Sequence, residues 1–263
     1  MRFPALTILA ALLIGAVPAT ADQAAPLAAH RAFYQLTLDQ ARGTEVAGAS
    51  GTMAFEVLDA CDGWATRQRL QMTVTNRDGQ DIQMLSDYST WESKDGLSMR
   101  FRLRQTTDTA VTSEVAGAAS LERPGGHGEV RYSMPEAISK QLPVGTLFPM
   151  VHTEAILTAA RAGKKFIALP LFDGTSEKGA QDSSVVVVNW NGPKPGKWPE
   201  LSGLASGRVH VAFFDRDAAS QQPDYEVGMR YWDNGVADEL DMDFGDFVMK
   251  GTLSQLAVLP PGC

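Results

Sequence analysis

Hydrophobic and polar residues alternate along most of the chain, as they do in strands that bury one face. The clearest case runs from Glu239 to Phe244, where three acidic residues alternate with three apolar ones. The run before it, Tyr225 to Trp232, is joined to it through Asn234 and Gly235, and Asn-Gly between two alternating runs is a strong hairpin signal. The sequence therefore predicts that these two strands pair antiparallel.

Similar alternating segments recur through the rest of the chain, and many are separated by turns rich in Gly, Pro, Asn and Asp. Ten or more short strands at this spacing predict an all-β fold with a meandering antiparallel sheet. The other predicted strands are 32–38, 51–58, 65–74, 82–92, 97–105, 128–133, 165–171, 184–190, 208–214 and 247–256.

One region departs from the strand pattern. From Pro149 the apolar residues follow helical spacing until Gly163, and proline suits the first turn of a helix while glycine suits the position after its end. We expect a helix of about 13 residues here, within an insertion near 146–163. A shorter helical turn is expected from Pro135 to Leu142. No linker interrupts residues 22–263, which are predicted to form one domain.

The first 21 residues have the pattern of a secretory signal peptide. Arg2 supplies a positive charge, Leu6 to Val17 is apolar, and Ala19-Thr20-Ala21 is a small-x-small cleavage pattern. Cleavage after Ala21 predicts a mature chain that begins at Asp22. The form of the signal favours a bacterial periplasm, with secretion beyond it left open.

The chain has two cysteines, Cys61 and Cys263, separated by 263 − 61 = 202 positions. Because export delivers them to an oxidising compartment, we expect them to form a disulfide. Such a bond would tie the last residue to an early strand. A redox-active pair is the alternative, but it would usually need a Cys-x-x-Cys spacing or a nearby base, which the flanking residues do not supply.

Charge and hydropathy exclude several classes of function. Removal of the signal takes away Arg2 and no acid, so 22 basic and 31 acidic residues leave a formal charge of 22 − 31 = −9. Nucleic-acid binding is not expected without a basic surface. No second apolar run approaches the roughly 20 residues that span a bilayer, so we expect no membrane insertion. The negative charge also predicts no direct contact with anionic lipid head groups.

The search for chemistry yields two candidate functional residues, His152 and Asp173. His152 lies on the predicted helix, where it serves either as a packing residue or as a general base. Asp173 belongs to Asp173-Gly174, which is typical of a turn but is also compatible with a nucleophile. The sequence shows no Gly-x-Ser-x-Gly and no paired histidines, and it predicts neither a catalytic centre nor a metal or cofactor site.

The acid-rich run from Asp238 to Asp246 allows a calcium site, although an alternating strand explains it better because Phe244 interrupts the ligand spacing. Methionine and aromatic residues are numerous on the predicted strand faces. They favour either a fully packed interior or a concave apolar cavity for a lipid, since methionine-lined concavities suit flexible apolar ligands.

Several stretches together resemble the EipB family of periplasmic cell-envelope integrity proteins of alphaproteobacteria, and the similarity extends from His30 to Cys263. They are Ala29-His30-Arg31-Ala32-Phe33-Tyr34-Gln35-Leu36, Gly145-Thr146-Leu147-Phe148-Pro149-Met150-Val151-His152-Thr153, Phe172-Asp173-Gly174 and the cysteines Cys61 and Cys263. The resemblance implies a monomeric, spiral-like broken β-barrel with a helix, a Cys61–Cys263 disulfide and a role in keeping the envelope intact under stress.

Three functional hypotheses follow. The first is a non-enzymatic periplasmic protein that supports envelope integrity by binding an envelope protein, lipid or glycan. The second is a lipid or lipoprotein carrier that uses a concave apolar sheet. The third is an enzyme, such as a hydrolase that uses His152 with Asp173. The resemblance implies no established catalytic activity, so we expect a protein that is not an enzyme and needs no cofactor.

Overall fold

The computed structural model describes residues 25–216 and 222–263, so the predicted signal peptide lies outside the described residues. The described residues form fourteen strands, one α-helix and a short 3-10 helix. The elements are β1 (His30–Ala41), β2 (Val46–Asp59), β3 (Gly63–Asn76), β4 (Asp81–Ser93), β5 (Ser98–Thr107), β6 (Ala110–Leu121), β7 (Gly128–Met134), β8 (Ser139–Leu142), α1 (Pro149–Arg161), β9 (Phe166–Leu171), β10 (Gln181–Val187), η1 (Pro199–Leu201), β11 (Ser206–Asp215), β12 (Tyr225–Trp232), β13 (Ala237–Asp243) and β14 (Phe247–Val258).

All fourteen strands belong to one antiparallel sheet, in the order β8-β7-β6-β5-β4-β3-β2-β1-β14-β13-β12-β11-β10-β9. The chain meanders through β1–β8 on one side and β9–β14 on the other, and the first and last strands pair in the middle. The predicted all-β fold is confirmed. The predicted hairpin is also observed, with Val227 opposite Met242.

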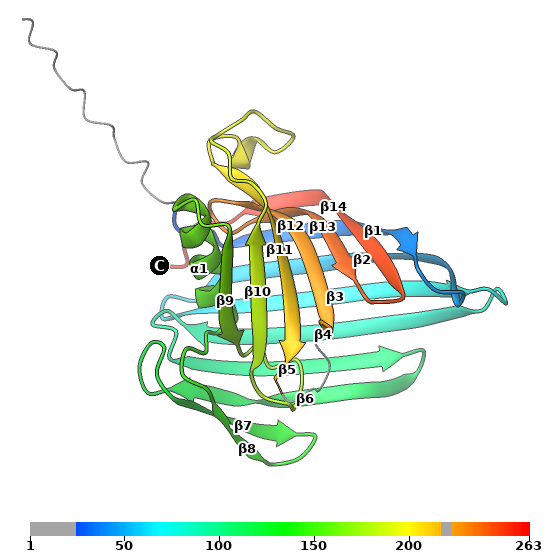
Figure 1. Ribbon diagram of the computed structural model, residues 1–263, viewed down its shortest axis with the longest axis horizontal. Coiled ribbons are helices and arrows are strands. Elements are labelled where there is room, and N and C mark those ends of the chain that lie inside the picture. Colours follow the sequence, from blue (N-terminus) through cyan, green and yellow to red (C-terminus); the bar gives the residue numbers. More distant parts are fainter. Residues whose placement is uncertain (1–24, 217–221) are drawn as a thin grey trace, which may run out of the picture.

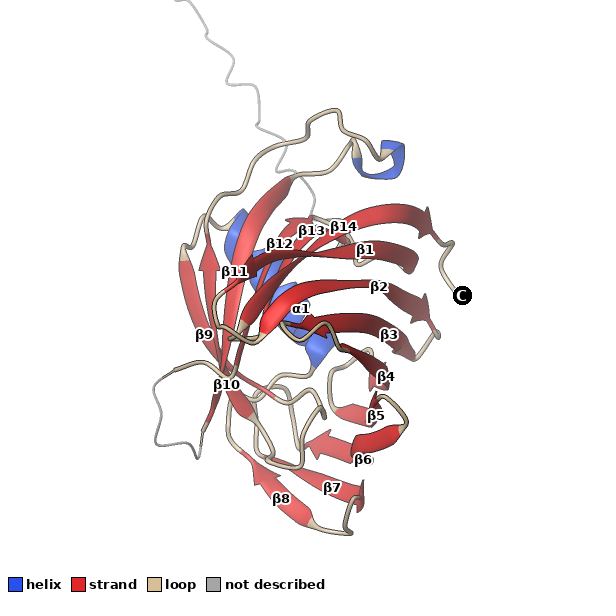
Figure 2. Cartoon of the chain, turned by 90° about the vertical axis from the view of Figure 1, so that its right-hand side faces the viewer, coloured by secondary structure: helices blue, strands red, loops and turns tan. Residues whose placement is uncertain are grey.

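The sheet curls but does not close into a complete barrel. In Figure 1, the shorter strands β9–β13 lie across the long strands β2–β6, while β8 and β9 remain as the two ends of the sheet. Figure 2 shows the curl from the side, with the strands wrapped around an interior. An isolated parallel bridge between Leu147 and Leu171 links the segment before α1 to the end of β9. The molecule is therefore a broken β-barrel.

One local prediction from the sequence is wrong, and one strand was not predicted. Pro135 to Leu142 contains no helical turn, because Ser139–Leu142 instead pairs antiparallel with the exposed edge of β7 and forms β8. Residues 110–121 form β6, which the sequence pattern missed because the strand is rich in small residues. Gly117 is one of these small residues, and a larger one does not fit there because a Cβ would lie 2.4 Å from the Arg131 carbonyl oxygen on β7.

Helix α1 has the length and position that the sequence predicts, and it lies at one end of the curled sheet (Figure 1). Its first turn has no side-chain cap of its own. Glu92 from β4 replaces that cap, accepting hydrogen bonds from Met150 N at 2.8 Å and Val151 N at 3.1 Å. Free N–H groups at a helix start favour a carboxylate. Further along the helix, Ile156 packs in a cluster with valines of β10 and β11.

An aromatic cluster fills the interior over one part of the sheet. Phe148 before α1 and Phe172 after β9 are fully buried and pack edge to face, with ring centroids 6.3 Å apart. Phe101 and Tyr132 continue this aromatic cluster on β5 and β7. The chain segments on either side of α1 and β9 therefore fill the interior over β5–β7.

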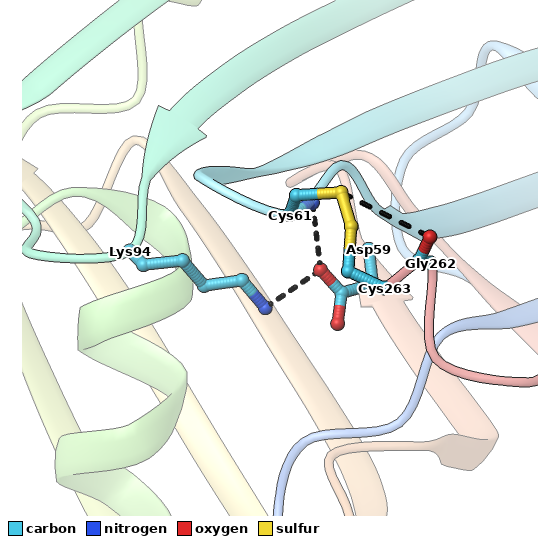
Figure 3. The surroundings of a disulfide bond; sticks show 5 residues. All are labelled: Asp59, Cys61, Lys94, Gly262 and Cys263. Atoms are coloured by element: carbon cyan, nitrogen blue, oxygen red, sulfur yellow. Dashed lines mark hydrogen bonds and ion pairs between the residues drawn. A yellow bond between two sulfur atoms is a disulfide. The ribbon is translucent and has the colours of Figure 1, made fainter.

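A disulfide joins Cys61, in the turn after β2, to Cys263 at the end of the chain (Figure 3). Beside it, Asp59 accepts a hydrogen bond from Cys61 N at 3.0 Å and forms an ion pair with Lys94 at 3.1 Å. The ammonium of Lys94 is the main cause that lowers the pKa of Asp59. The pairing expected from the sequence is thus present.

We predict that Cys61→Ser lowers the free energy of unfolding, by at most about 5 kcal/mol, because the crosslink restricts a long loop of the unfolded chain. Urea denaturation of the oxidised wild type, both single variants and the double serine variant measures the effect. The double variant should resemble either single variant. Unchanged urea midpoints in all variants would contradict a structural role for the disulfide.

Candidate functional site

An open cavity of about 580 Å³ occupies the interior between the two halves of the sheet. It lies beside the tightly packed aromatic cluster, and Met150 and Thr153 of α1 contribute to its wall. The alternation of the strands explains the lining, because every second residue of β1–β5 points inward. The sequence favoured either a packed interior or an apolar cavity, and the structure contains both.

Most of the cavity wall is apolar. We call this part of the wall the apolar region: residues of β1–β3 form one side of it, and residues of β11–β13, with Phe244 after β13, form the other. Its members include Tyr34, Met53, Phe55, Val57, Leu70, Phe213, Tyr225, Val227, Met229, Tyr231, Leu240, Met242 and Phe244. Leu240, Met242 and Phe244 are the apolar positions that the alternating run predicted.

A second region of the cavity wall is polar, and we call it the polar mouth. It consists of Ser86, Gln105, Asp173, Thr175 and Gln181. Ser86 and Gln105 face each other across β4 and β5. Gln105 and Thr175 are exposed to solvent, which sets this region at the opening of the cavity.

Asp173 is the central residue of the polar mouth. Its Oδ1 accepts hydrogen bonds from Thr175 N at 3.0 Å and Thr175 Oγ1 at 2.8 Å, which is the turn that the sequence predicts. Its Oδ2 accepts one from Gln181 Nε2 at 2.8 Å. The Tyr88 hydroxyl donates to the Asp173 carbonyl and so connects this loop to β4. Burial raises the pKa of Asp173, although these hydrogen bonds oppose the shift.

Gly174 explains how the Asp173 loop reaches the sheet. Its φ of +72° suits glycine, and a Cβ at this position would lie 2.4 Å from the ring of Phe101. The loop therefore packs directly on the inner face of β5. This close approach is what brings Asp173 to the cavity, even though Tyr88 and Asp173 are 85 residues apart in the sequence.

His152, the other candidate residue, lies apart from Asp173. Its Nε2 is 2.8 Å from Ser183 Oγ, and the Ser183 hydroxyl donates to the Leu169 carbonyl at 2.9 Å. In this arrangement His152 donates its Nε2 proton and does not act as a base toward Ser183. Ser183 is fully buried, and no hydrogen bond joins His152 to Asp173 among the described residues. The two candidates do not form one catalytic site.

The charges around the cavity are unusual. Asp173 is the only Asp, Glu, Lys or Arg among the described residues that line it. His30 also lines the cavity, and its Nδ1 donates to the Ala28 carbonyl at 2.8 Å. Burial lowers the pKa of His30, which favours its neutral form. No sequence pattern predicts this distribution of charge, because Asp173 reaches the cavity from a loop.

The outer face of the same strands carries a second concave surface, which we call the arginine groove. Five arginines and two acids line this groove of about 470 Å³, a local balance of 5 − 2 = +3. Phe33 and Phe55 contribute aromatic surface. The arginines are Arg31, Arg67, Arg69, Arg102 and Arg104. No described acid forms an ion pair with Arg67 or Arg104.

The acid-rich run forms β13, as the strand interpretation predicts, and several of its carboxylates pair with arginines. Asp238 pairs with Arg230 at 2.6 Å, and Asp241 pairs with Arg208 at 3.0 Å. Within the described ranges, no group of three or more His, Cys, Asp or Glu side chains is placed to hold a metal ion. None of the described helices is both long and apolar enough to cross a membrane.

These features define a class of protein: a disulfide-tied, broken β-barrel with an apolar cavity that opens through a polar mouth. The chain belongs to the EipB-like family, whose model matches residues 21–260. It is 33% identical over 252 aligned residues to the cell envelope integrity protein EipB of Brucella abortus (strain 2308), covering 93% of this chain and 89% of that protein.

A solved structure is also similar. It is a β-barrel-like protein of a domain of unknown function from Brucella abortus, with a TM-score of 0.81 and 30% identity. The match covers 90% of this chain and all of that one. The resemblance drawn from the sequence motifs is therefore confirmed, together with the broken-barrel fold.

Two buried titratable residues at the start of α1 oppose each other in their effect on stability. Burial lowers the pKa of His152 from 6.5 to about 4, so its contribution to stability is present above pH 6.5 and declines as the pH falls toward 4. Burial raises the pKa of Glu92 from 4.5 to about 7 despite its backbone hydrogen bonds. Its contribution is largest below pH 4.5 and declines as the pH rises to 7.

We predict that single variants separate these two effects. Relative to the wild type, the free energy of unfolding of His152→Gln should rise by about 2 kcal/mol between pH 7 and pH 4.5, because the variant no longer loses the contribution of a neutral, buried His152. In Glu92→Gln, it should fall as the pH drops from 6.5 to 4. Urea denaturation across this pH range measures both slopes. Parallel profiles for the two variants would contradict the opposing assignments.

Proposed function

We propose that the protein supports the integrity of the cell envelope from the periplasm by binding an acyl-chain ligand in its cavity, without catalysing a reaction. The observation that carries this proposal is the wide apolar region, which lines an open cavity instead of being filled by side chains. Methionines at Met53, Met229 and Met242 give this region a surface that adapts to flexible chains. The family membership and the envelope role named for the Brucella relative support a function in the cell envelope.

The size of the cavity agrees with such a ligand. Its volume of about 580 Å³ lies within the range of roughly 300–1,000 Å³ typical of small-molecule pockets. Each methylene group buried there contributes about 0.8 kcal/mol, so a chain of ten carbons would supply substantial binding free energy. A lipid or lipoprotein carrier is the specific form of this function. The alternative of an enzyme has less support, because the Ser183 hydroxyl next to His152 is fully buried and is not an accessible nucleophile.

We predict that protein purified from its native periplasm retains a lipid, and that filling the cavity removes it. Leu70→Trp with Val227→Trp adds bulk from opposite walls of the apolar region. Native mass spectrometry and solvent extraction should then find less bound lipid, and envelope protection in a deletion strain should fall.

The matched control is Val111→Trp with Val144→Trp, which adds the same side chains at exposed positions. This control should keep both lipid and protection, and circular dichroism establishes that each variant folds. Protection that persists in a folded, cavity-filled variant would contradict the proposal. A lipid-free wild type with full protection in the same cells would contradict it as well.

A second candidate function is a scaffold that contacts an acidic segment of an envelope protein through the arginine groove. The observation in its favour is the combination of unpaired Arg67 and Arg104 with two phenylalanines, because arginine and aromatic residues are enriched at protein interfaces. Local positive charge on a chain that is negative overall would also direct an acidic partner to this face.

We predict that Arg67→Ser with Arg104→Ser reduces envelope protection under stress if the arginine groove is used, with no loss of thermal stability. Arg77→Ser with Arg123→Ser makes the same change in net charge at exposed turn positions and should keep protection. The measurement is survival of a deletion strain that expresses each variant. Equal survival with the two double variants would exclude a role for the arginine groove. Flotation of the purified protein with anionic vesicles, which we do not expect, would indicate that the groove binds a lipid surface instead.

A further inference from the structure

The cavity has an amphipathic lining that follows from the register of its strands. Tyr34, Met53 and Leu240 are buried deep in the apolar region. Gln105 and Thr175 lie at the exposed opening, together with Asp173. A ligand that matched this lining would carry its apolar chain inward and its polar group at the mouth. The chemistry of the mouth then selects the head group.

Asp173 has hydrogen-bonding capacity left for a ligand. A carboxylate offers about four acceptor positions. Two hydrogen bonds from Thr175 occupy Oδ1, while Oδ2 accepts, from the described part of the chain, only the one from Gln181. No described Lys or Arg forms an ion pair with Asp173, and none lines the cavity. The carboxylate therefore stands at the mouth without a positive partner.

The negative charge of Asp173 favours some ligand head groups over others. An ionised carboxylate beside apolar surface is destabilised unless a positive group or further donors offset it, and the raised pKa of Asp173 reflects this environment. A carboxylate or phosphate head group at the same position would meet a like charge and no basic side chain. An ammonium group would supply both a charge and several N–H donors.

We propose that the cavity selects an acyl-chain ligand with an amine-bearing head group, whose ammonium binds Asp173 Oδ2 at the polar mouth while the chain lies in the apolar region. This inference rests on the proposed function, because it names the ligand class for the same cavity. Tyr88 supports the position, since its hydroxyl holds the Asp173 backbone against β4.

The test compares three probes with the same chain length: dodecylamine, dodecanol and dodecanoic acid. Calorimetric titration of the full mature protein below the micelle-forming concentrations gives each affinity. The amine should bind about tenfold more tightly than the alcohol, which corresponds to one charge-assisted hydrogen bond. The acid should bind more weakly than the alcohol.

Asp173→Asn removes the charge but keeps an oxygen that can accept from Thr175. In this variant the amine should lose its tenfold advantage, whereas the affinity for dodecanol should stay the same. Asp78→Asn is the matched control, because it makes the same charge change in the exposed turn between β3 and β4. It should keep the wild-type ranking, which separates the local effect of Asp173 from general attraction of cations to an acidic protein.

The outcomes distinguish the inference from the function on which it rests. Equal binding of amine and alcohol, or tighter binding of the acid, overturns the amine selectivity but leaves a chain-binding cavity. An unchanged amine preference in folded Asp173→Asn also overturns it. If no probe binds, the acyl-chain function fails, and the inference fails with it. If Asp173→Asn does not fold, the ranking of the three probes by the wild type decides.

Discussion

The pairing of β1 with β14 is the constraint on which the rest of the structure depends. It joins the meander of β1–β8 to that of β9–β14 in one continuous sheet, in which side chains of β12 and β13 pack against those of β2 and β3. Forming it requires closure of nearly the whole chain, which is an entropic cost that local contacts do not offset. The Cys61–Cys263 disulfide acts on the same closure, because it fixes the end that follows β14 beside the turn that follows β2. Crosslink and strand pairing therefore stabilise the same long-range arrangement.

The cavity results from how the remaining space is filled. Phe148 and Phe172 close the interior over β5–β7, and α1 covers one end. Between β1–β3 and β11–β13, buried side chains of the strands themselves, among them Tyr34, Met53 and Met242, form the wall of the open cavity. A larger apolar plug there would bury more surface and stabilise the fold. Instead, methionine and tyrosine side chains line an open cavity, and we infer that a ligand makes the apolar contacts that a plug would have made.

Sequence reasoning succeeded where the signal was local. The alternation through Leu240 and Met242, the Asn234-Gly235 turn and the Pro149 helix start each depend on neighbouring residues, and the structure contains all three. It failed at β8, where pairing with β7 overrides the local pattern, and at β6, where small residues weaken the pattern. The polar mouth could not be predicted from the sequence for a different reason. Asp173 was identified as a turn residue, but only the fold shows that this turn lies against β5 and faces an apolar cavity.

The two candidate surfaces lie on opposite faces of the same strands, and this has a consequence for assigning function. On β3, Arg67 and Arg69 line the arginine groove, whereas Leu70 lines the cavity. Period-two alternation therefore gives the two surfaces different chemistry on one shared backbone, and Phe55, Gln68 and Tyr88 line both. A ligand that spreads β1–β3 from within would alter the spacing of the arginines outside. A carrier that reports its loading to a partner needs that kind of connection, so the two functions are compatible within one sheet.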